Sequence, residues 1–414
     1  MRAWLLLVAG CGRIGFDAGS TPPPPDDAIT TFTGPHADPT LLPRATGQLE
    51  PANAPGAALA AKDSYLDPTS GVRIWKLTDA NFPIANTNGR VERELAGAQV
   101  SAAFDDDVHT VAVVLEVGNQ GRRYLIDVQH DAGIKGTREL VLQGGEDTMA
   151  FTADPTEPRL LFAGDLGGRL HRVDSATNTV IDRAPFPVAD VYTLPSVAAA
   201  ARVVVAQSTK TGFVAINTTT RTIDELPTGG EQIPTVDHDG LFLVTKTSDS
   251  SLLWRIGEAG TSQFTPPTGD FQASTGVLGG FVAVDVDTGA GDMAFWYSEP
   301  LFRRHTQFGS YGGYDSVQLA SQWIQTDVPV DQQWVLYTVA ERGFSPPGRL
   351  DDAIGFLRLD GDLRFLAHHH APDNAGYYDS PRASMSPDGR MVVFTSTMGT
   401  NRTDVYLAQV PLSP

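Results

Sequence analysis

The sequence predicts an all-β fold, a seven-bladed β-propeller, and three observations support this fold class. The chain has 414 residues with 41 Gly and 29 Pro, a turn-rich composition that suits many short strands. Strand-like apolar runs recur every 40 to 60 residues or so, roughly the period of a four-stranded propeller blade. No long amphipathic helical pattern interrupts them. The alternatives are a propeller with six or eight blades and a pair of β-sandwiches.

The repeated unit is clearest near the C-terminal end, between Ser380 and Pro411. A strand over 382–386 meets the tight turn Pro387-Asp388-Gly389, in which Pro pre-sets φ and Gly takes a positive φ. An apolar strand over 391–395 follows, and a third strand runs over 404–410. Weaker copies of this order upstream indicate a repeat.

The second strand of each unit is a continuous run of β-branched, aliphatic or aromatic residues, as expected for a strand packed on both faces. We predict these strands at 110–115, 159–163, 202–206, 241–245, 293–297, 334–339 and 391–395. The inner strands that precede them are marked by Phe104, Phe151, Val197, Val236, Val284, Ile324 and Met385. The count is seven units, and the fifth, around 270–320, can be divided in more than one way.

The last unit has only three strands before the chain ends, whereas the strand over 72–78 stands alone before the first complete unit. Pairing this early strand beside the strand over 404–410 would complete the last blade and remove an exposed sheet edge. The sequence therefore predicts a ring closed by an N-terminal strand in the last blade.

The N-terminal region indicates export and anchoring. Arg2 precedes a short apolar run too short to span a bilayer, and the run Val8-Ala9-Gly10-Cys11 contains the only cysteine. This run resembles the lipobox of bacterial lipoproteins, and the resemblance implies lipidation at Cys11. We predict a signal peptide over 1–10, a disordered Pro/Ala/Asp-rich tether over 11–61 and the propeller domain over 62–414.

The final blade carries a family resemblance. The run Ser386 to Arg390, the apolar strand after it and Asp404-Val405-Tyr406 look like the blade repeat of TolB-like propellers. The run from Asp67 to Arg73, ahead of Leu77-Thr78-Asp79, resembles the start of propellers of the oligogalacturonate lyase type. The likeness implies the fold, and blade repeats do not by themselves specify a function.

Charge and cysteine content exclude several classes of function. The net charge is −19, from 30 basic and 49 acidic residues, and no basic cluster that could follow a phosphate backbone is present. A nucleic-acid partner is therefore not expected, and an anionic polymer would need a local basic patch. A single cysteine excludes an intrachain disulfide and a cysteine-rich zinc site. We expect a monomer that contacts the membrane only through its lipid.

Two connections between units are rich in chemically active residues. The first contains His368-His369-His370, Tyr377, Tyr378, Asp379 and Arg382. On a continuing strand His368 and His370 would face one side and His369 the other. His368 and His370 could then chelate a divalent metal, with Asp379 or His305 completing the site. The alternative is a strand that ends in a polar surface loop.

The second connection, over 302–315, pairs cations with aromatic rings. Arg304, Tyr311 and Tyr314 are candidate ligand-binding residues there, together with Arg382, because Arg can grip a carboxylate and Tyr can stack on a sugar. The alternative is an ordinary Gly-rich loop with a solvated Arg pair.

Two functions follow. The favoured one is an envelope-anchored scaffold that binds a protein or a glycan. The alternative is a uronate polysaccharide lyase, which needs a metal or cation on the carboxylate, a base and an acid. His305, His369, Tyr377 and Tyr378 are the candidate catalytic residues.

The chain departs from the lyase family at one place. In that family, metal-binding histidines two residues apart directly precede the final inner strand, whereas Ser380 and Arg382 occupy those positions here. The metal site that the resemblance implies is therefore not preserved in place, and Arg382 has a structural alternative role at the closure of the ring.

Overall fold

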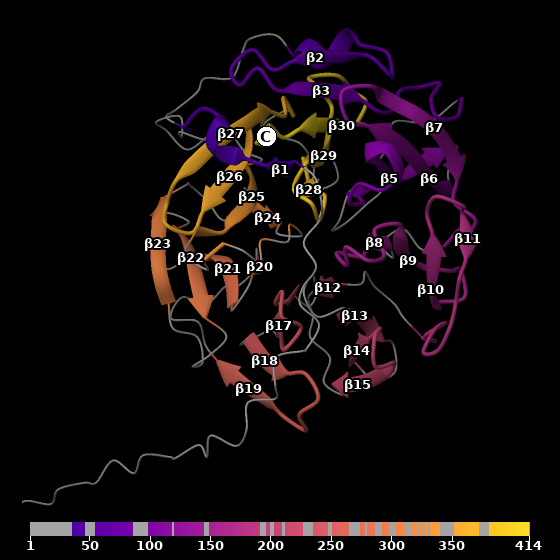
Figure 1. Ribbon diagram of the computed structural model, residues 1–414, viewed down its shortest axis with the longest axis vertical. Coiled ribbons are helices and arrows are strands. Elements are labelled where there is room, and N and C mark those ends of the chain that lie inside the picture. The colour runs from indigo at the N-terminus through magenta and orange to yellow at the C-terminus, as the bar shows by residue number, and fades with distance from the viewer. Residues whose placement is uncertain are drawn as a thin grey trace, which may run out of the picture.

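The computed structural model describes most of the propeller and parts of the N-terminal region. The described residues are 35–45, 54–85, 98–117, 120–144, 149–190, 196–198, 203–208, 212–226, 235–246, 251–264, 274–277, 280–285, 292–297, 304–310, 317–320, 323, 325, 328–329, 332–339, 352–371 and 381–413. Their strands form small sheets arranged around a central axis (Figure 1), and the helical segments described are three short 3₁₀ turns. The prediction of an all-β propeller is confirmed.

Six sheets are regular blades of four consecutive antiparallel strands. The first three blades are β4 (Gln99–Val100), β5 (Val108–Val117), β6 (Gln120–Gln129) and β7 (Gly133–Glu139); β8 (Met149–Phe151), β9 (Leu160–Gly164), β10 (Leu170–Asp174) and β11 (Thr179–Val180); and β12 (Ser196–Ala198), β13 (Val203–Ser208), β14 (Gly212–Asn217) and β15 (Thr222–Leu226). The next three are β16 (Thr235–Val236), β17 (Phe242–Lys246), β18 (Ser251–Arg255) and β19 (Thr261–Phe264); β20 (Ser274–Val277), β21 (Gly280–Asp285), β22 (Asp292–Tyr297) and β23 (Arg304–Ser310); and β24 (Val317–Ala320), β25 (Trp334–Val339), β26 (Ala353–Arg358) and β27 (Leu363–His368).

A five-stranded closing sheet joins the two ends of the propeller. Its order is β2 (Ser64–Leu66), β3 (Arg73–Lys76), β30 (Asp404–Gln409), β29 (Met391–Ser396) and β28 (Ala383–Met385). Strand β3 pairs with β30 in an antiparallel register that places Ile74 opposite Ala408 and Lys76 opposite Tyr406. The predicted closure by an early strand is therefore confirmed, and β2 adds an outer strand that the sequence did not indicate.

The number of blades depends on how the closing sheet is counted. Innermost strands contact one another in a closed cycle, in the order β4, β8, β12, β16, β20, β24 and β28, and then β4 again. Six members of this cycle belong to regular four-stranded blades, and the seventh belongs to the closing sheet. The predicted count of seven is reached only when this composite sheet is included.

The fifth blade differs from its prediction by one strand. The run 293–297, predicted as a second strand, lies in β22, the third strand of the blade, and the marker Val284 lies in β21, the second strand. The inner strand β20 is a short Ser-Thr-Gly-Val segment with little apolar signal. Because β22 is as apolar as the second strands of the other blades, the sequence pattern predicts the second strand at β22, one strand later than it lies in the structure.

The predicted disordered tether does not extend to residue 61. Strand β1 (His36–Ala37) pairs with β31 (Leu412–Ser413), and two 3₁₀ turns follow, η1 (Pro39–Leu41) and η2 (Pro55–Ala58). Leu42 is buried, and Ala45 donates a backbone hydrogen bond to Leu363 at the outer strand of the sixth blade. This segment is ordered with few apolar side chains because the edges of existing strands supply hydrogen-bond partners for its backbone. The remaining 3₁₀ turn, η3 (Asp105–Asp107), forms the first turn of the first blade.

The hydrophobic core lies between neighbouring blades. One cluster joins the sixth blade to the closing sheet through residues such as Phe356, Met385 and Phe394. Further clusters join the closing sheet to the first blade, the first to the second, the second to the third and the third to the fourth. In the described residues, the closing sheet and the first three blades therefore bury both faces against their neighbours, which is why their second strands are continuous apolar runs.

Candidate functional site

The three consecutive histidines lie at the end of β27, the outermost strand of the sixth blade. Their exposed fractions are 0% for His368, 0% for His369 and 4% for His370. The rings of His368 and His370 are adjacent, with centroids 5.8 Å apart, whereas the His369 ring contacts a different part of the blade. Strand β27 ends at His368, so the histidines do not continue the strand on which the predicted alternation depended, and they form a buried seam in place of the polar surface loop.

His369 is committed to structural hydrogen bonds. Its Nε2 lies 2.6 Å from the carbonyl oxygen of Val339, and its Nδ1 accepts from the backbone N–H of Ala371 at 3.0 Å. These partners fix a neutral imidazole with the proton on Nε2. The backbone carbonyl of His369 also accepts from Ser396 at the end of β29. Both ring nitrogens of His369 therefore have hydrogen-bond partners in the described contacts, so neither is available as a general base.

His368 and His370 face the turn between β2 and β3. The His368 backbone N–H donates to Asp67 Oδ2 at 3.2 Å, and its ring Nδ1 lies 3.8 Å from the same oxygen. Burial alone would raise the pKa of Asp67, but His368 and the backbone N–H groups of Ser70 and Thr69 lower it below its ordinary value. Burial, followed by the neighbouring histidines, lowers the pKa of His370 to about 4.

This seam attaches the closing sheet to the sixth blade. Ser70 Oγ donates to the carbonyl of Leu366 in β27 at 2.6 Å, and the Ser70 backbone N–H donates to Asp67 Oδ1 at 2.8 Å. The Asp67 carboxylate thus caps its own turn and holds the end of β27. A polar cluster of this kind orders a junction between chain segments that are far apart in sequence.

The other predicted site residues are spread over several elements or lie outside the described part of the chain. Arg304 and His305 lie on β23, the outermost strand of the fifth blade, rather than in a connection that leads to an inner strand. Arg382 directly precedes the innermost strand β28. The residues Tyr311, Tyr314, Tyr377, Tyr378, Asp379 and Cys11 lie outside the described residues. Metal binding by His368, His370 and Asp379 stays a prediction, and the described residues contain no group of three suitable side chains that could hold a metal ion.

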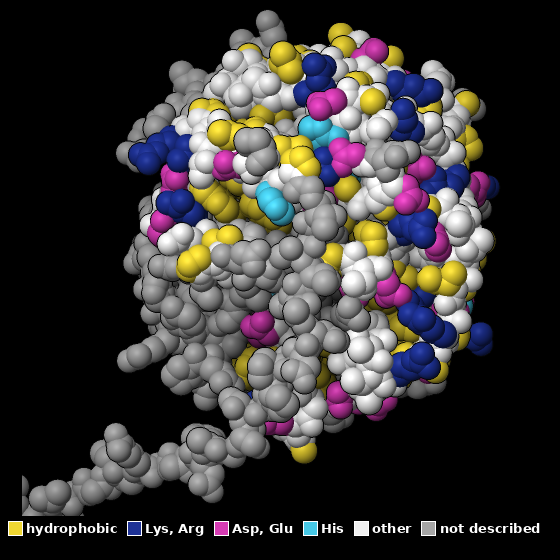
Figure 2. All heavy atoms as spheres, in the orientation of Figure 1, with side chains coloured by type: hydrophobic (Ala, Val, Ile, Leu, Met, Phe, Trp, Pro, Cys, Tyr) yellow, Lys and Arg dark blue, Asp and Glu magenta, His cyan; other side chains and the backbone are white. Residues whose placement is uncertain are grey.

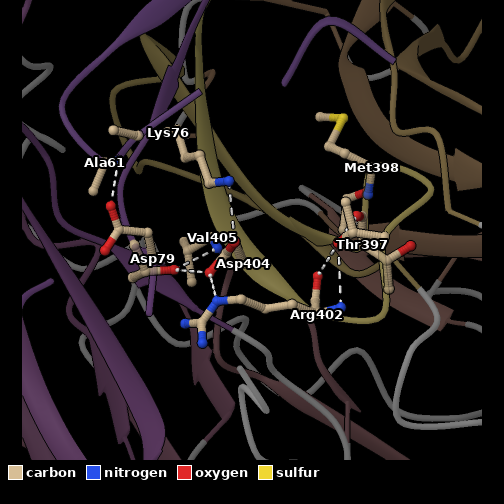
Figure 3. A network of polar contacts seen from close by, with 12 residues as sticks. Ala61, Lys76, Asp79, Thr397, Met398, Arg402, Asp404 and Val405 are labelled. Carbon is tan, nitrogen blue, oxygen red and sulfur yellow. Dashed lines mark hydrogen bonds and ion pairs between the residues drawn. The ribbon is translucent and has the colours of Figure 1, made fainter. Parts of the chain in front are cut away.

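A second buried polar network holds the closing sheet together (Figure 3). Asp404 lies between Lys76 Nζ, 3.2 Å from Oδ2, and Arg402 Nε, 2.8 Å from Oδ1. Thr78 donates its hydroxyl to the same carboxylate at 3.0 Å. Burial raises the pKa of Asp404 although the two cations act in the opposite direction. The network fixes the register of β3 against β30.

A third network involves Ser386, Asp388 and His109, residue types that also form catalytic triads. Here the aspartate is the central member, because Asp388 accepts from Ser386 Oγ at 2.5 Å and lies 3.0 Å from His109 Nε2. Burial would raise the pKa of Asp388, but His109 and these hydrogen bonds lower it far below the ordinary range. A nucleophilic serine needs a direct contact with the base, so this arrangement joins the closing sheet to the first blade rather than performing catalysis.

An open polar pocket lies between the second and third blades. Its volume is about 290 Å³, and its lining residues are Thr156, Glu157, Arg183, Thr218, Thr219 and Arg221. These come from the turn between β8 and β9, the segment after β11, and the turn between β14 and β15. In Figure 2, Lys and Arg side chains gather over this part of the ring, between the positions of β10 and β14 in Figure 1.

The charges in this pocket are unequal. Glu157 Oε1 accepts from Arg172 at 2.9 Å and from Arg183 at 3.0 Å, so one carboxylate already has two guanidinium partners. Arg221 makes no side-chain hydrogen bond or ion pair with the described residues. This pocket has no signature in the sequence, because its residues come from two turns and the segment after β11 and match no motif.

Comparison with known structures supports the propeller fold. No protein-family model and no curated protein matches the chain. Among solved structures, an oligogalacturonate lyase in complex with manganese matches with a TM-score of 0.53 at 14% identity, over 85% of this chain and 99% of that one. The likeness shows that the fold of this chain is a β-propeller similar to that of the oligogalacturonate lyase.

A second solved structure shows how general this propeller fold is. A chain of the mitotic checkpoint complex matches with a TM-score of 0.51 at 15% identity, over 85% of this chain and 98% of that one. At such identities the likeness extends to the fold and not to the site. In the described residues, no helix is both long enough and apolar enough to cross a bilayer.

Proposed function

We propose that this propeller is a ligand-binding scaffold for a protein or a glycan. The observation that carries this proposal is the position of the histidine triplet, the richest set of candidate catalytic groups in the sequence. His369 has both ring nitrogens in structural contacts, and His368 and His370 are buried at a junction between blades. A catalytic base must reach its substrate, and the burial of these three histidines at the junction works against that role.

The similar structures agree with a scaffold but do not require one. One is described as a lyase with manganese and the other belongs to a protein complex, so the same ring serves both uses. Propellers bind partners on the surfaces that their inter-strand turns create. We count the closing sheet as a seventh blade, since its innermost strand completes the cycle of inner strands.

We further propose that the scaffold is held at a bacterial cell envelope. The support is the lipobox-like run that ends at Cys11, together with the Pro-rich stretch after it. In this arrangement the lipid is the only membrane contact and the propeller acts as a monomer. Growth with a radiolabelled fatty acid would test this, because the wild-type chain should be labelled and a Cys11→Ser variant should not.

The uronate lyase is the alternative that an experiment must exclude. Purified protein is incubated with polygalacturonate, alginate and other acidic polysaccharides, with and without added Mn²⁺ or Ca²⁺, and the absorbance of unsaturated uronides is followed. The scaffold proposal predicts no rise in absorbance on any substrate. A rise that a His369→Ala variant abolishes, while the variant keeps its melting temperature, would show that the chain is a lyase.

A further inference from the structure

We infer that the pocket between the second and third blades binds the carboxylate of a sugar acid. This inference rests on the proposed scaffold function and names the ligand class of one of its surfaces. The pocket combines two lining guanidinium groups, Arg183 and Arg221, with three threonines and a single carboxylate that is already neutralised.

The local charge favours an anion. Arg172, Arg183 and Arg221 outnumber Glu157, and the nearby Asp182 is engaged by the His171 ring at 2.7 Å. In a chain of net charge −19, such a local excess attracts one oxyanion, while the acidic surroundings repel a densely charged polymer.

The loop that carries Arg221 is held in shape before any ligand arrives. Asn217 accepts through its side chain from the backbone N–H groups of Thr219 and Thr220 at 3.0 and 2.9 Å. The Arg221 backbone N–H donates to the carbonyl of Asn217 at 2.9 Å, and Arg221 has a φ of 62° in the left-handed region. Binding therefore orders the guanidinium side chain and not the backbone, which reduces the entropic cost.

The lining chemistry points to a hydroxylated acid rather than an apolar one. All six lining residues are polar or charged, whereas pockets for drug-like ligands are lined mostly by apolar side chains. Planar guanidinium groups match a carboxylate in geometry, and threonine hydroxyls can donate to or accept from sugar hydroxyls. A single sugar ring with one carboxylate fits a pocket of about 290 Å³ that opens to solvent.

The test is isothermal titration calorimetry of the full chain with trigalacturonate, with the neutral galactose trimer and with inorganic phosphate. Arg221→Gln removes the unpaired cation. The matched control is Arg169→Gln, an exposed arginine in the turn between β9 and β10 of the second blade, at the opposite end of the strands from the pocket. Arg169 likewise makes no side-chain hydrogen bond or ion pair with the described residues.

We expect trigalacturonate to bind and the neutral trimer to give no heat. The Arg221→Gln change should weaken binding about three- to tenfold, the range for a partly exposed charge-assisted contact, and Arg169→Gln should leave it unchanged. Trigalacturonate that binds equally well to both variants and to Arg183→Gln would overturn the pocket assignment but leave the scaffold function standing. Phosphate that binds as tightly as the sugar acid, or a wild-type chain that does not bind trigalacturonate, would overturn the ligand class.

Discussion

The buried His370 predicts how the stability of the propeller falls in acid. Its pKa is lowered to about 4 in the folded chain against 6.5 for an ordinary histidine. The folded state therefore keeps the ring neutral while the unfolded chain takes up a proton below pH 6.5. Stability from this group is fully present above pH 6.5 and is lost as the pH falls to 4, by about 3 kcal/mol in total.

The perturbation is His370→Asn, because asparagine tolerates the positive φ of 52° at this position and does not titrate. The groups that face His370 are His368, His369, Asp67 and Asp352, and all remain in the variant. Urea unfolding at pH 7, 5.5 and 4 gives the free energy of unfolding of both proteins. Between pH 7 and 4 the wild type should lose about 3 kcal/mol more than the variant. Equal losses in both proteins would refute the assignment.

Three further changes test other contacts. His171→Gln should lower the free energy of unfolding by about 1 kcal/mol at pH 5.5 and by less at pH 9. The raised pKa of His171 stabilises the fold fully below pH 6.5, and this stability is lost as the pH rises through the raised pKa of the folded state. Equal losses at the two pH values in urea unfolding would contradict this. Gly389→Ala should lower the melting temperature far more than Gly71→Ala, since both have a positive φ but only at Gly389 would the new Cβ meet an indole ring, at 2.5 Å; equal shifts would exclude the clash. Asp404→Ala should destabilise the fold by about 3 to 5 kcal/mol because Lys76 would stay buried without its carboxylate. The double variant Lys76→Met with Asp404→Leu should recover most of this loss in chemical unfolding. A double variant that is no more stable than Asp404→Ala would contradict this explanation.

The sequence predicted the fold well where local chemistry and burial agree. The Pro387-Asp388-Gly389 turn and the apolar run after it specify two strands and their connection without tertiary information. The closure of the ring was also predictable, because a three-stranded last unit and an unpaired early strand each leave an edge that only the other can cover.

Other parts of the fold could not be predicted because their stability comes from distant partners. Strand β20 has few apolar residues, so only its neighbours in the ring define it. The segment around Leu42 resembles a tether in composition, yet it is buried against the sixth blade. Short segments of this kind form because pre-existing strand edges supply their hydrogen bonds.

The candidate site was the least predictable part. Three consecutive histidines suggested exposed chemistry, but the seam that buries them includes Asp67, which lies 301 positions away from His368 in the sequence. The pocket with Arg183 and Arg221 arises where turns of two blades meet. Neither neighbourhood leaves a local signal, because both depend on how the blades are placed around the ring.

The most direct test of the scaffold account is a crystal structure of the protein grown with trigalacturonate and Mn²⁺. The account predicts an intact sugar whose carboxylate lies against Arg221 and Arg183, between the second and third blades. A cleaved sugar in the central channel beside a metal ion held by histidines would contradict it.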